Sequence, residues 1–237
     1  MFIEVVLDAR RKVLSVPESM ALLTAFHVPT VRSGVAHSAN EALVIAETIG
    51  YPIVMKVLSP DITHKSDSGG VRLNIVSAHE VRNVYRQMME QVRANVPDAK
   101  IEGVTVEKMY RSNTGRELMI GVARDPVFGP VISFGSGGTA VEVVADAAIS
   151  LPPLNRQLAE DLIRRTKVSR LLAGYRDVPA VNMEALVDVL LAVSTMVCEL
   201  PWIQEMDINA LMADDAGVVA VDARIIVDYP QVSTDPY

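Results

Sequence analysis

Residues with catalytic potential are densest in the segment Ser59–Gly70, SPDITHKSDSGG. It combines two glycines and five aspartates or serines with one lysine and one histidine. Backbone amides in such a loop can point at an anion, and Lys65 can neutralise its charge. His64 is then a candidate phosphoryl acceptor or acid/base, because imidazole is nucleophilic and has a pKa near neutrality. An ordinary polar turn with a solvated histidine fits these residues equally well.

Two further features suggest phosphate binding. Lys56 lies in the middle of an apolar, β-branched run, where a charge is costly unless it has a partner. A lysine at a sheet edge, with its ammonium group in water, is the commoner explanation of such a residue, and a phosphate-contacting cation is the alternative. The second feature is the glycine segment Gly135–Gly138 (GSGG), which we expect to form a loop after a strand. Tight turns use short glycine runs more often than phosphate sites do.

Three oxygen-bearing side chains near the C-terminus form a candidate metal site. Asp207 and Asn209 are separated by one residue in a predicted strand, so they lie on the same face of it. An antiparallel neighbour places Asp222 beside them. Mg²⁺ takes few protein ligands and completes its shell with phosphate and water, so this donor set suits it. A solvent-facing hairpin is the alternative, although the neighbouring apolar residues favour a cleft.

The elements that must position these residues follow from changes in the hydrophobic period. Helices are predicted at five places: Ser15–Val28, Ser38–Ile49, Ala78–Ala94, Asn155–Arg165 and Met183–Glu199. Strands are predicted at seven: Tyr51–Leu58, Val71–Val76, Glu102–Met109, Glu117–Ala123, Pro130–Phe134, Gln204–Leu211 and Val218–Ile226. Interleaved helices and hairpin-like strand pairs predict an α+β or α/β fold in which the sheet is not purely parallel.

Composition narrows the class of protein. The chain has 237 residues, 50% hydrophobic and 22% charged, with a net charge of −7. This length predicts one large domain or two small lobes. The acidic balance argues against a nucleic-acid partner, and no apolar run is long enough for a membrane span. The single cysteine, Cys198, lies in an apolar helical pattern that predicts a core position, and its isolation fits a reducing, cytoplasmic location.

Three segments together resemble the ATP-grasp domain of ADP-forming acetyl-CoA and acyl-CoA synthetases, which are acid–thiol ligases. They are EALVIAETIGYPIVMKVLSPDITHKSDSGGV, RELMIGVARDPVFGPVISFGSGGTAVEVVAD and MDINALMADDAGVVAVDARII. Their order and spacing carry the resemblance, which extends from about Pro17 to Asp228. The chain departs from the usual DINP motif at Ala210 and carries Ser136 and Thr139 where the family commonly has apolar residues.

The resemblance implies an ATP-grasp fold, in which two α+β lobes hold ATP or ADP between them. It implies an N-terminal extension (residues 1–14), a small lobe (15–105), a large lobe (106–228) and a linker-like tail (229–237). Lys56 and Lys65 would offset the charge of the nucleotide phosphates. The strand containing Glu107, Lys108 and Met109 would read adenine through its backbone. The predicted glycine loop, with Gly135, Gly137 and Gly138, would close on the phosphates, and Asn209 and Asp222, with Asp207 nearby, would hold Mg²⁺.

The family's reaction implies a partner. Acyl-CoA gives an acyl phosphate, which phosphorylates a histidine on a CoA-binding α-type subunit or fused domain, and the phosphoryl group then passes to ADP. His64 occupies the position of a relay histidine. The sequence contains no CoA-binding or main phosphohistidine domain, so the chain needs that partner.

Two alternatives differ in function. One is a nucleotide-sensing regulatory module of a protein fused to a lysine acetyltransferase. The other is a succinyl-CoA-type ligase, which the SPDITHKSDSGG loop disfavours.

Overall fold

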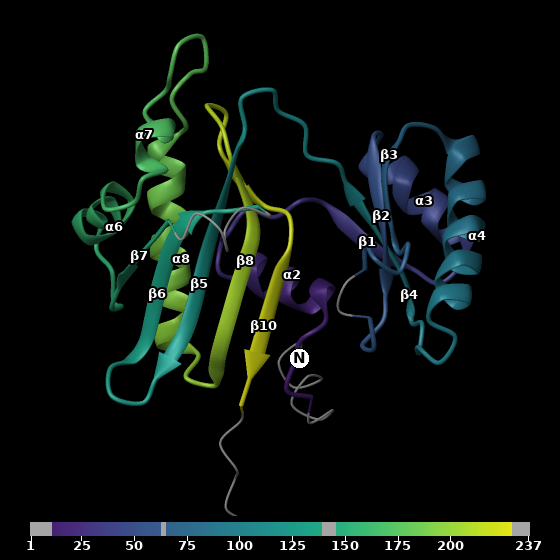
Figure 1. Cartoon of the computed structure of the whole chain (residues 1–237), viewed down its shortest axis with the longest axis horizontal. Helices are drawn as coiled ribbons and strands as arrows, with labels where there is room; N and C mark the ends of the chain where they lie inside the picture. Colours follow the sequence, from purple (N-terminus) through teal and green to yellow (C-terminus); the bar gives the residue numbers. More distant parts are fainter. Residues whose placement is uncertain (1–10, 63–64, 139–145, 229–237) are drawn as a thin grey trace, which may run out of the picture. The chain divides into compact units, whose positions relative to one another are not determined.

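A computed structural model describes residues 11–62, 65–138 and 146–228 (Figure 1). Contacts between residues divide the chain into two compact units. The small unit consists of Val31–Arg111, and the large unit contains the residues before and after it. Each unit has its own sheet and its own covering helices, so each is described by itself.

The small unit is a four-stranded antiparallel sheet in the order β1-β4-β2-β3. Its strands are β1 (Ser33–Ala36), β2 (Ile53–Leu58), β3 (Val71–Ile75) and β4 (Gly103–Lys108). Two helices, α3 (Ala39–Ile49) and α4 (Ala78–Asn95), pack on one face of this sheet (Figure 1). The Ser38 side chain caps the first of them by accepting a hydrogen bond from the Glu41 N–H at 3.2 Å.

Alternation along β2 and β4 sorts their side chains between two faces. Met55 and Val57 on β2, and Val104 and Val106 on β4, belong to the core that the two helices cover. The residues between them face the other way, because successive side chains of a strand point to opposite faces. That second face carries the polar side chains of β2 and β4, which are the ones of interest for binding.

The large unit is a six-stranded antiparallel sheet in the order β10-β8-β5-β6-β7, with β9 also paired to β8. Its strands are β5 (Arg116–Asp125), β6 (Gly129–Ser136), β7 (Ala147–Ser150), β8 (Ile203–Ala213), β9 (Val218–Ala220) and β10 (Ala223–Val227). In the described part of this unit, four helices accompany it: α2 (Val16–Ala25), α6 (Arg156–Arg164), α7 (Ser169–Leu172) and α8 (Met183–Glu199). Helix α8 buries eight residues and lies behind the sheet in Figure 1.

Helix α2 shows how local sequence and tertiary packing combine. Ser15 and Glu18 form a capping box, as the S-x-x-E pattern indicates: the Ser15 side chain accepts from the Glu18 N–H, and the Glu18 carboxylate accepts from the Ser15 N–H. The helix packs against β10. Residues 15–30 therefore belong to the large unit, whereas the sequence predicted them in the small lobe.

The observed division into units also differs from the predicted boundary between residues 105 and 106. That boundary would cut β4, whose pairing with β1 and β2 keeps it whole in the small unit as far as Lys108. Residues 11–14 of the predicted extension join the large unit, where the Leu14 N–H donates to the Ile225 carbonyl at 3.0 Å. Residues 1–10 and the tail 229–237 lie outside the described residues.

All five predicted helices and six of the seven predicted strands are present, with ends shifted by up to three residues. The strand predicted over Val218–Ile226 is wrong, because it is broken at Val221–Asp222 into β9 and β10. Among the residues that the structure describes, three short elements were not predicted: β1, β7 and α7. Cys198 is exposed on α8 and not in the core. Among the helices within the described ranges, none combines the length and apolar surface that crossing a bilayer requires.

Candidate functional site

In the small unit, Lys56 meets a carboxylate. Its ammonium group lies 2.7 Å from Oε2 of Glu107, and both side chains are largely buried, with 13% and 5% of their surfaces exposed. The Thr105 hydroxyl donates to Oε1 of the same carboxylate at 2.7 Å. Lys56 is therefore neither an edge-strand lysine nor a solvated one, since β2 is a central strand and its side chain lies against β4.

Lys108 and Met109 are tied to the segment before β2. The Lys108 ammonium donates to the carbonyls of Gly50 and Tyr51 at 3.1 and 2.7 Å. The Met109 N–H donates to the Pro52 carbonyl at 3.1 Å. These contacts give Lys108 a structural task within the small unit, and adenine recognition by this segment remains a prediction.

The loop after β2 returns to the strand directly beside Lys56. The Val57 N–H donates to the Gly70 carbonyl, and the Gly70 N–H donates to the Lys65 carbonyl, both at 2.7 Å. A side chain at Gly70 would clash with Val57, so this glycine is needed for close approach to β2. The loop thus holds the backbone of Lys65 near the C-terminal end of β2, the strand that carries Lys56. His64, the predicted relay residue, lies outside the described residues.

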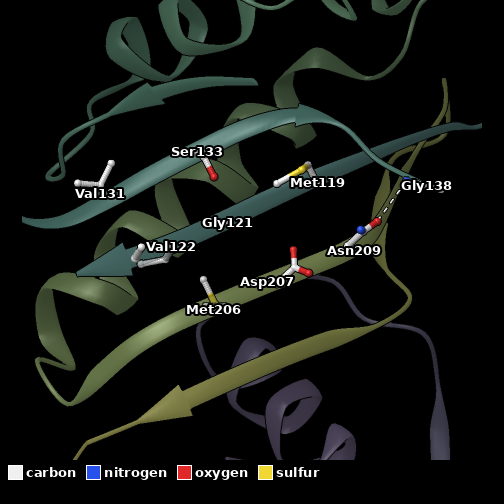
Figure 2. A pocket seen from close by; sticks show the side chains of 10 residues that line it. Met119, Gly121, Val122, Val131, Ser133, Gly138, Met206, Asp207 and Asn209 are labelled. Carbon is white, nitrogen blue, oxygen red and sulfur yellow. Dashed lines mark hydrogen bonds between the residues drawn. The ribbon is translucent and has the colours of Figure 1, made fainter. Parts of the chain in front are cut away.

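In the large unit, a cavity of about 480 Å³ opens on the face of the sheet formed by β5, β6 and β8 (Figure 2). Ten residues line it: Met119, Gly121, Val122, Ala123, Val131, Ser133, Gly138, Met206, Asp207 and Asn209. Three of these are residues that the sequence singled out. Figure 2 shows the Asp207 and Asn209 side chains on the same side of β8, as alternation along the strand predicts.

Asn209 links β8 to the end of the glycine segment. Its Oδ1 accepts the Gly138 N–H at 3.2 Å (Figure 2). Gly138 has a φ of +78°, a conformation that L side chains rarely adopt, and a Cβ there would run into the Glu117 carboxylate. The backbone conformation therefore favours glycine at position 138, and a side chain there would also require Glu117 to move.

Asp222 lies in the break between β9 and β10. The flanking residues Ala220 and Ala223 pair with Leu211 and Ile208 of β8, which places Asp222 across from the middle of that strand. Its Oδ1 accepts the N–H of Ala223 at 2.9 Å. The sequence predicted a neighbouring strand residue here, whereas the chain actually presents Asp222 from a break between two strands.

The electrostatics of Asp207 depend on Asp222. Partial burial raises the pKa of the Asp207 carboxyl, the Asp222 carboxylate raises it further, and Arg224 opposes them. A cation between the two carboxylates would relieve this repulsion, so the donor set fits Mg²⁺. Within the described ranges, no cluster of three or more His, Cys, Asp or Glu could hold a metal alone. Two carboxylates and one amide suit an ion that takes its remaining ligands from phosphate and water.

The glycine segment differs from the predicted loop. Strand β6 continues to Ser136, and Gly135 pairs with Met119 on one side and Ala147 on the other. A Cβ at Gly135 would clash with the Asp146 carbonyl oxygen, and one at Gly137 would approach Leu118 O to 2.5 Å. Close packing in the sheet therefore explains these two glycines, and a role in phosphate binding remains a prediction.

Sequence reasoning missed Asp146. Its carboxylate is buried and accepts the N–H groups of Lys167 and Val168 at 2.6 and 2.7 Å, while its carbonyl accepts the Ser136 N–H at 3.2 Å. It thus ties the glycine segment to the start of α7. A lone aspartate at the end of an undetected strand gives no sequence signal. Gly121 and Ser133 were also missed, because their place in the cavity depends on how β5 pairs with β6.

Comparisons with known proteins agree with this architecture. An ATP-grasp domain model matches residues 5–227. The beta subunit of acetate–CoA ligase [ADP-forming] I from Pyrococcus furiosus is 40% identical over 219 residues, which cover 92% of this chain and 94% of that subunit. Acetate–CoA ligase [ADP-forming] I from Archaeoglobus fulgidus is 39% identical over 95% of this chain, but the match spans only 32% of that longer protein.

A solved structure of acetyl-coenzyme A synthetase 1 from Candidatus Korarchaeum cryptofilum superimposes with a TM-score of 0.85 at 35% identity. It covers 96% of this chain and all of the matched chain. That structure contains coenzyme A and Mg-AMPPCP, with a phosphohistidine segment pointing towards the nucleotide binding site. The fold, the family model and the relatives all indicate the same family. The chain belongs to the ATP-grasp domain family, of the type that forms the beta subunit of ADP-forming acetyl-CoA synthetases, which are ligases.

Proposed function

We propose that this chain binds ADP or ATP with Mg²⁺ and transfers a phosphoryl group between that nucleotide and a phosphohistidine of a CoA-binding partner. The overall conversion is acyl-CoA, phosphate and ADP to free acid, CoA and ATP. One observation carries the proposal: the cavity of the large unit brings Asp207 and Asn209 together with Gly138 at the end of the glycine segment. Relatives named as ADP-forming ligases support it.

The small unit supplies the cationic part of the nucleotide site. Lys56 and Lys65 contact the phosphates, and the backbone of the segment containing Glu107, Lys108 and Met109 contacts adenine. The Lys56 ammonium is held by a buried carboxylate and has three N–H donors, so contact with a phosphate oxygen does not require it to leave Glu107. A neighbouring cation stabilises the negative charge on the transferring oxygens.

The large unit supplies the oxygen ligands. Asn209 and Asp222 hold Mg²⁺, with Asp207 beside them, and Gly137 and Gly138 lie next to the phosphates. Bound Mg²⁺ bridges phosphate oxygens and neutralises charge that develops during transfer. The Mg-AMPPCP in the Korarchaeum structure supports the choice of metal.

The nucleotide proposal is tested by isothermal titration calorimetry with ADP and ATP, with and without Mg²⁺. We expect binding that strengthens when Mg²⁺ is added, and that Lys56→Ala weakens while Lys100→Ala, at an exposed ion pair with Glu102, does not. If neither nucleotide binds with Mg²⁺ present, the proposed function is wrong.

The transfer step requires the partner. We propose that it is an α-type subunit or fused domain that binds CoA and carries the main phosphohistidine, and that His64 relays the phosphoryl group. Phosphate labelling of the reconstituted complex, followed by peptide mass spectrometry, should find phosphohistidine at position 64, and His64→Asn should block ATP formation. Absence of label on His64 during turnover would rule out the relay. Nucleotide binding without any transfer would favour the regulatory module of a lysine acetyltransferase instead.

A further inference from the structure

A chain of three polar side chains crosses the sheet face of the small unit that helices α3 and α4 leave uncovered. The Thr105 hydroxyl donates to Glu107 Oε1, and the Lys56 ammonium pairs with Glu107 Oε2, both at 2.7 Å. Each oxygen of the carboxylate thus has its own donor. Two directional contacts fix the plane of the carboxylate, and with it the place where Lys56 is held.

Strand register produces this arrangement. Lys56 of β2 is directly opposite Thr105 of β4, and Val54 is opposite Glu107. Glu107 is therefore the diagonal neighbour of Lys56 on the same face, within reach of a long side chain. Thr105 and Glu107 are two residues apart and so share that face. All three side chains come from the two central strands of the sheet.

Burial shows that packing alone does not explain the arrangement. Thr105 and Glu107 are each only 4% exposed. Desolvation of a buried ion pair offsets much of its Coulombic attraction, and well-packed apolar side chains of similar size stabilise a sheet at least as well. What the pair provides that an apolar pair does not is a charged ammonium group held in one place.

We propose that Glu107 and Thr105 are positioning residues for Lys56, which hold its ammonium group ready for the phosphates of the bound nucleotide. This rests on the proposed function, in which Lys56 contacts those phosphates. A free lysine side chain has many rotamers, and ordering it before the ligand arrives removes that entropic cost from binding. Thr105 acts through Glu107: by occupying Oε1, it leaves Oε2 facing Lys56.

A positioning role is separated from a general structural role by comparing ligands that carry phosphates, ADP and ATP, with adenosine, which carries none. Glu107→Gln keeps the size of the side chain but removes its charge. It should weaken Mg²⁺-ADP and Mg²⁺-ATP binding by about 10- to 100-fold, the range found at metal sites when a residue that orients a ligand is replaced. Adenosine binding, followed by ligand-observed NMR, should change by less than about threefold, because adenosine has no phosphate for Lys56 to meet.

Thr105→Val and Thr105→Ser form a matched pair. Valine is nearly isosteric with threonine but has no hydroxyl, so it should weaken ADP and ATP binding by about 3- to 10-fold. Serine keeps the hydroxyl and should restore most of the affinity. Glu102→Gln changes an exposed carboxylate paired with Lys100 in the same unit and should leave all three ligands bound as before. Thr105→Val also provides the test if Glu107→Gln does not fold.

A double-mutant cycle completes the test. When Lys56→Met has already removed the ammonium group, Glu107→Gln should cause no further loss of ATP affinity, because its effect passes through Lys56. Additive losses would overturn the proposal, as would equal weakening of adenosine and ATP or wild-type affinities in both Glu107→Gln and Thr105→Val. If the wild-type chain binds neither ADP nor ATP, the proposed function itself fails, and the positioning role fails with it.

Discussion

The Gly138 N–H donates to Oδ1 of Asn209 over 3.2 Å and so joins the glycine segment to strand β8 at the edge of the cavity. The amide oxygen of Asn209 thus holds the backbone of Gly138, at the end of the glycine segment. The same oxygen is the one that we propose as a Mg²⁺ ligand. Binding of the metal would therefore be coupled to the position of Gly138.

Asn209→Ala tests this coupling. The substitution removes both the proposed ligand and the acceptor for Gly138, so we expect Mg²⁺-dependent ADP binding to weaken by about tenfold or more, or about 1.4 kcal/mol. Asn209→Asp keeps an oxygen and should retain most of the affinity. Calorimetry with and without Mg²⁺ measures the difference. An equal loss in both conditions would show that Asn209 does not act through the metal.

Gly135→Ala should destabilise the large unit. The new methyl group would clash with the backbone of Asp146, which is fixed by pairing between β6 and β7. We expect a loss of about 3 kcal/mol or more in the free energy of unfolding, measured by denaturant titration. Gly217→Ala is the matched control, because a Cβ there meets no atom within 4 Å, and its effect should stay within about 0.5 kcal/mol. Similar values for both variants would contradict this account.

Asp146→Ala should also weaken the large unit, for a different reason. It leaves the N–H groups of Lys167 and Val168 without their acceptor. Unsatisfied donors of this kind, one buried and one partly buried, cost about 1–3 kcal/mol each, so we expect a total loss of about 2–6 kcal/mol. Asp188→Ala breaks only an exposed pair with Arg156 and should cost less than about 1 kcal/mol in the same denaturation experiment. The prediction fails if the two variants are equally stable.

Lys108→Met separates a structural from a binding role at that residue. It removes the donor to the carbonyls of Gly50 and Tyr51, and we expect a loss of about 1–3 kcal/mol in unfolding free energy. Thermal and denaturant unfolding measure the stability, and adenosine binding to the folded variant measures recognition. Unchanged stability with lost adenosine binding would show that the side chain serves the nucleotide alone.

Tyr51 makes the stability of the small unit depend on pH in the alkaline range. Burial, together with the hydrogen bond that its hydroxyl donates to Glu47 at 2.9 Å, raises the pKa of Tyr51 from 10.0 to about 12. Because the unfolded chain loses this proton first, the stabilising contribution is complete below pH 10 and disappears as the pH rises to about 12. Absorbance titration at alkaline pH should show a late-titrating tyrosine that Tyr51→Phe removes. Its persistence in that variant would contradict the assignment.

Local sequence determined most of the secondary structure of this protein. Ser15, Ser38 and Asn155 each cap the helix that was predicted to follow them, because a cap depends only on residues within one turn. The shared face of Asp207 and Asn209 was predictable for a similar reason, since alternation is a property of a single strand. The ordered motifs also identified the family, which the comparisons confirm.

Only the tertiary structure decided the contacts of these residues, because each contact depends on how strands pair. Lys56 meets Glu107 through the register of β2 with β4, and Gly135 is restricted by β7, a strand too short to predict. Asp222 lies across from β8 in a break of a predicted strand, since β9 and β10 pair separately with β8. Pairing between residues distant in sequence has no local signal, so the sequence specified the chemical groups and the fold specified their partners.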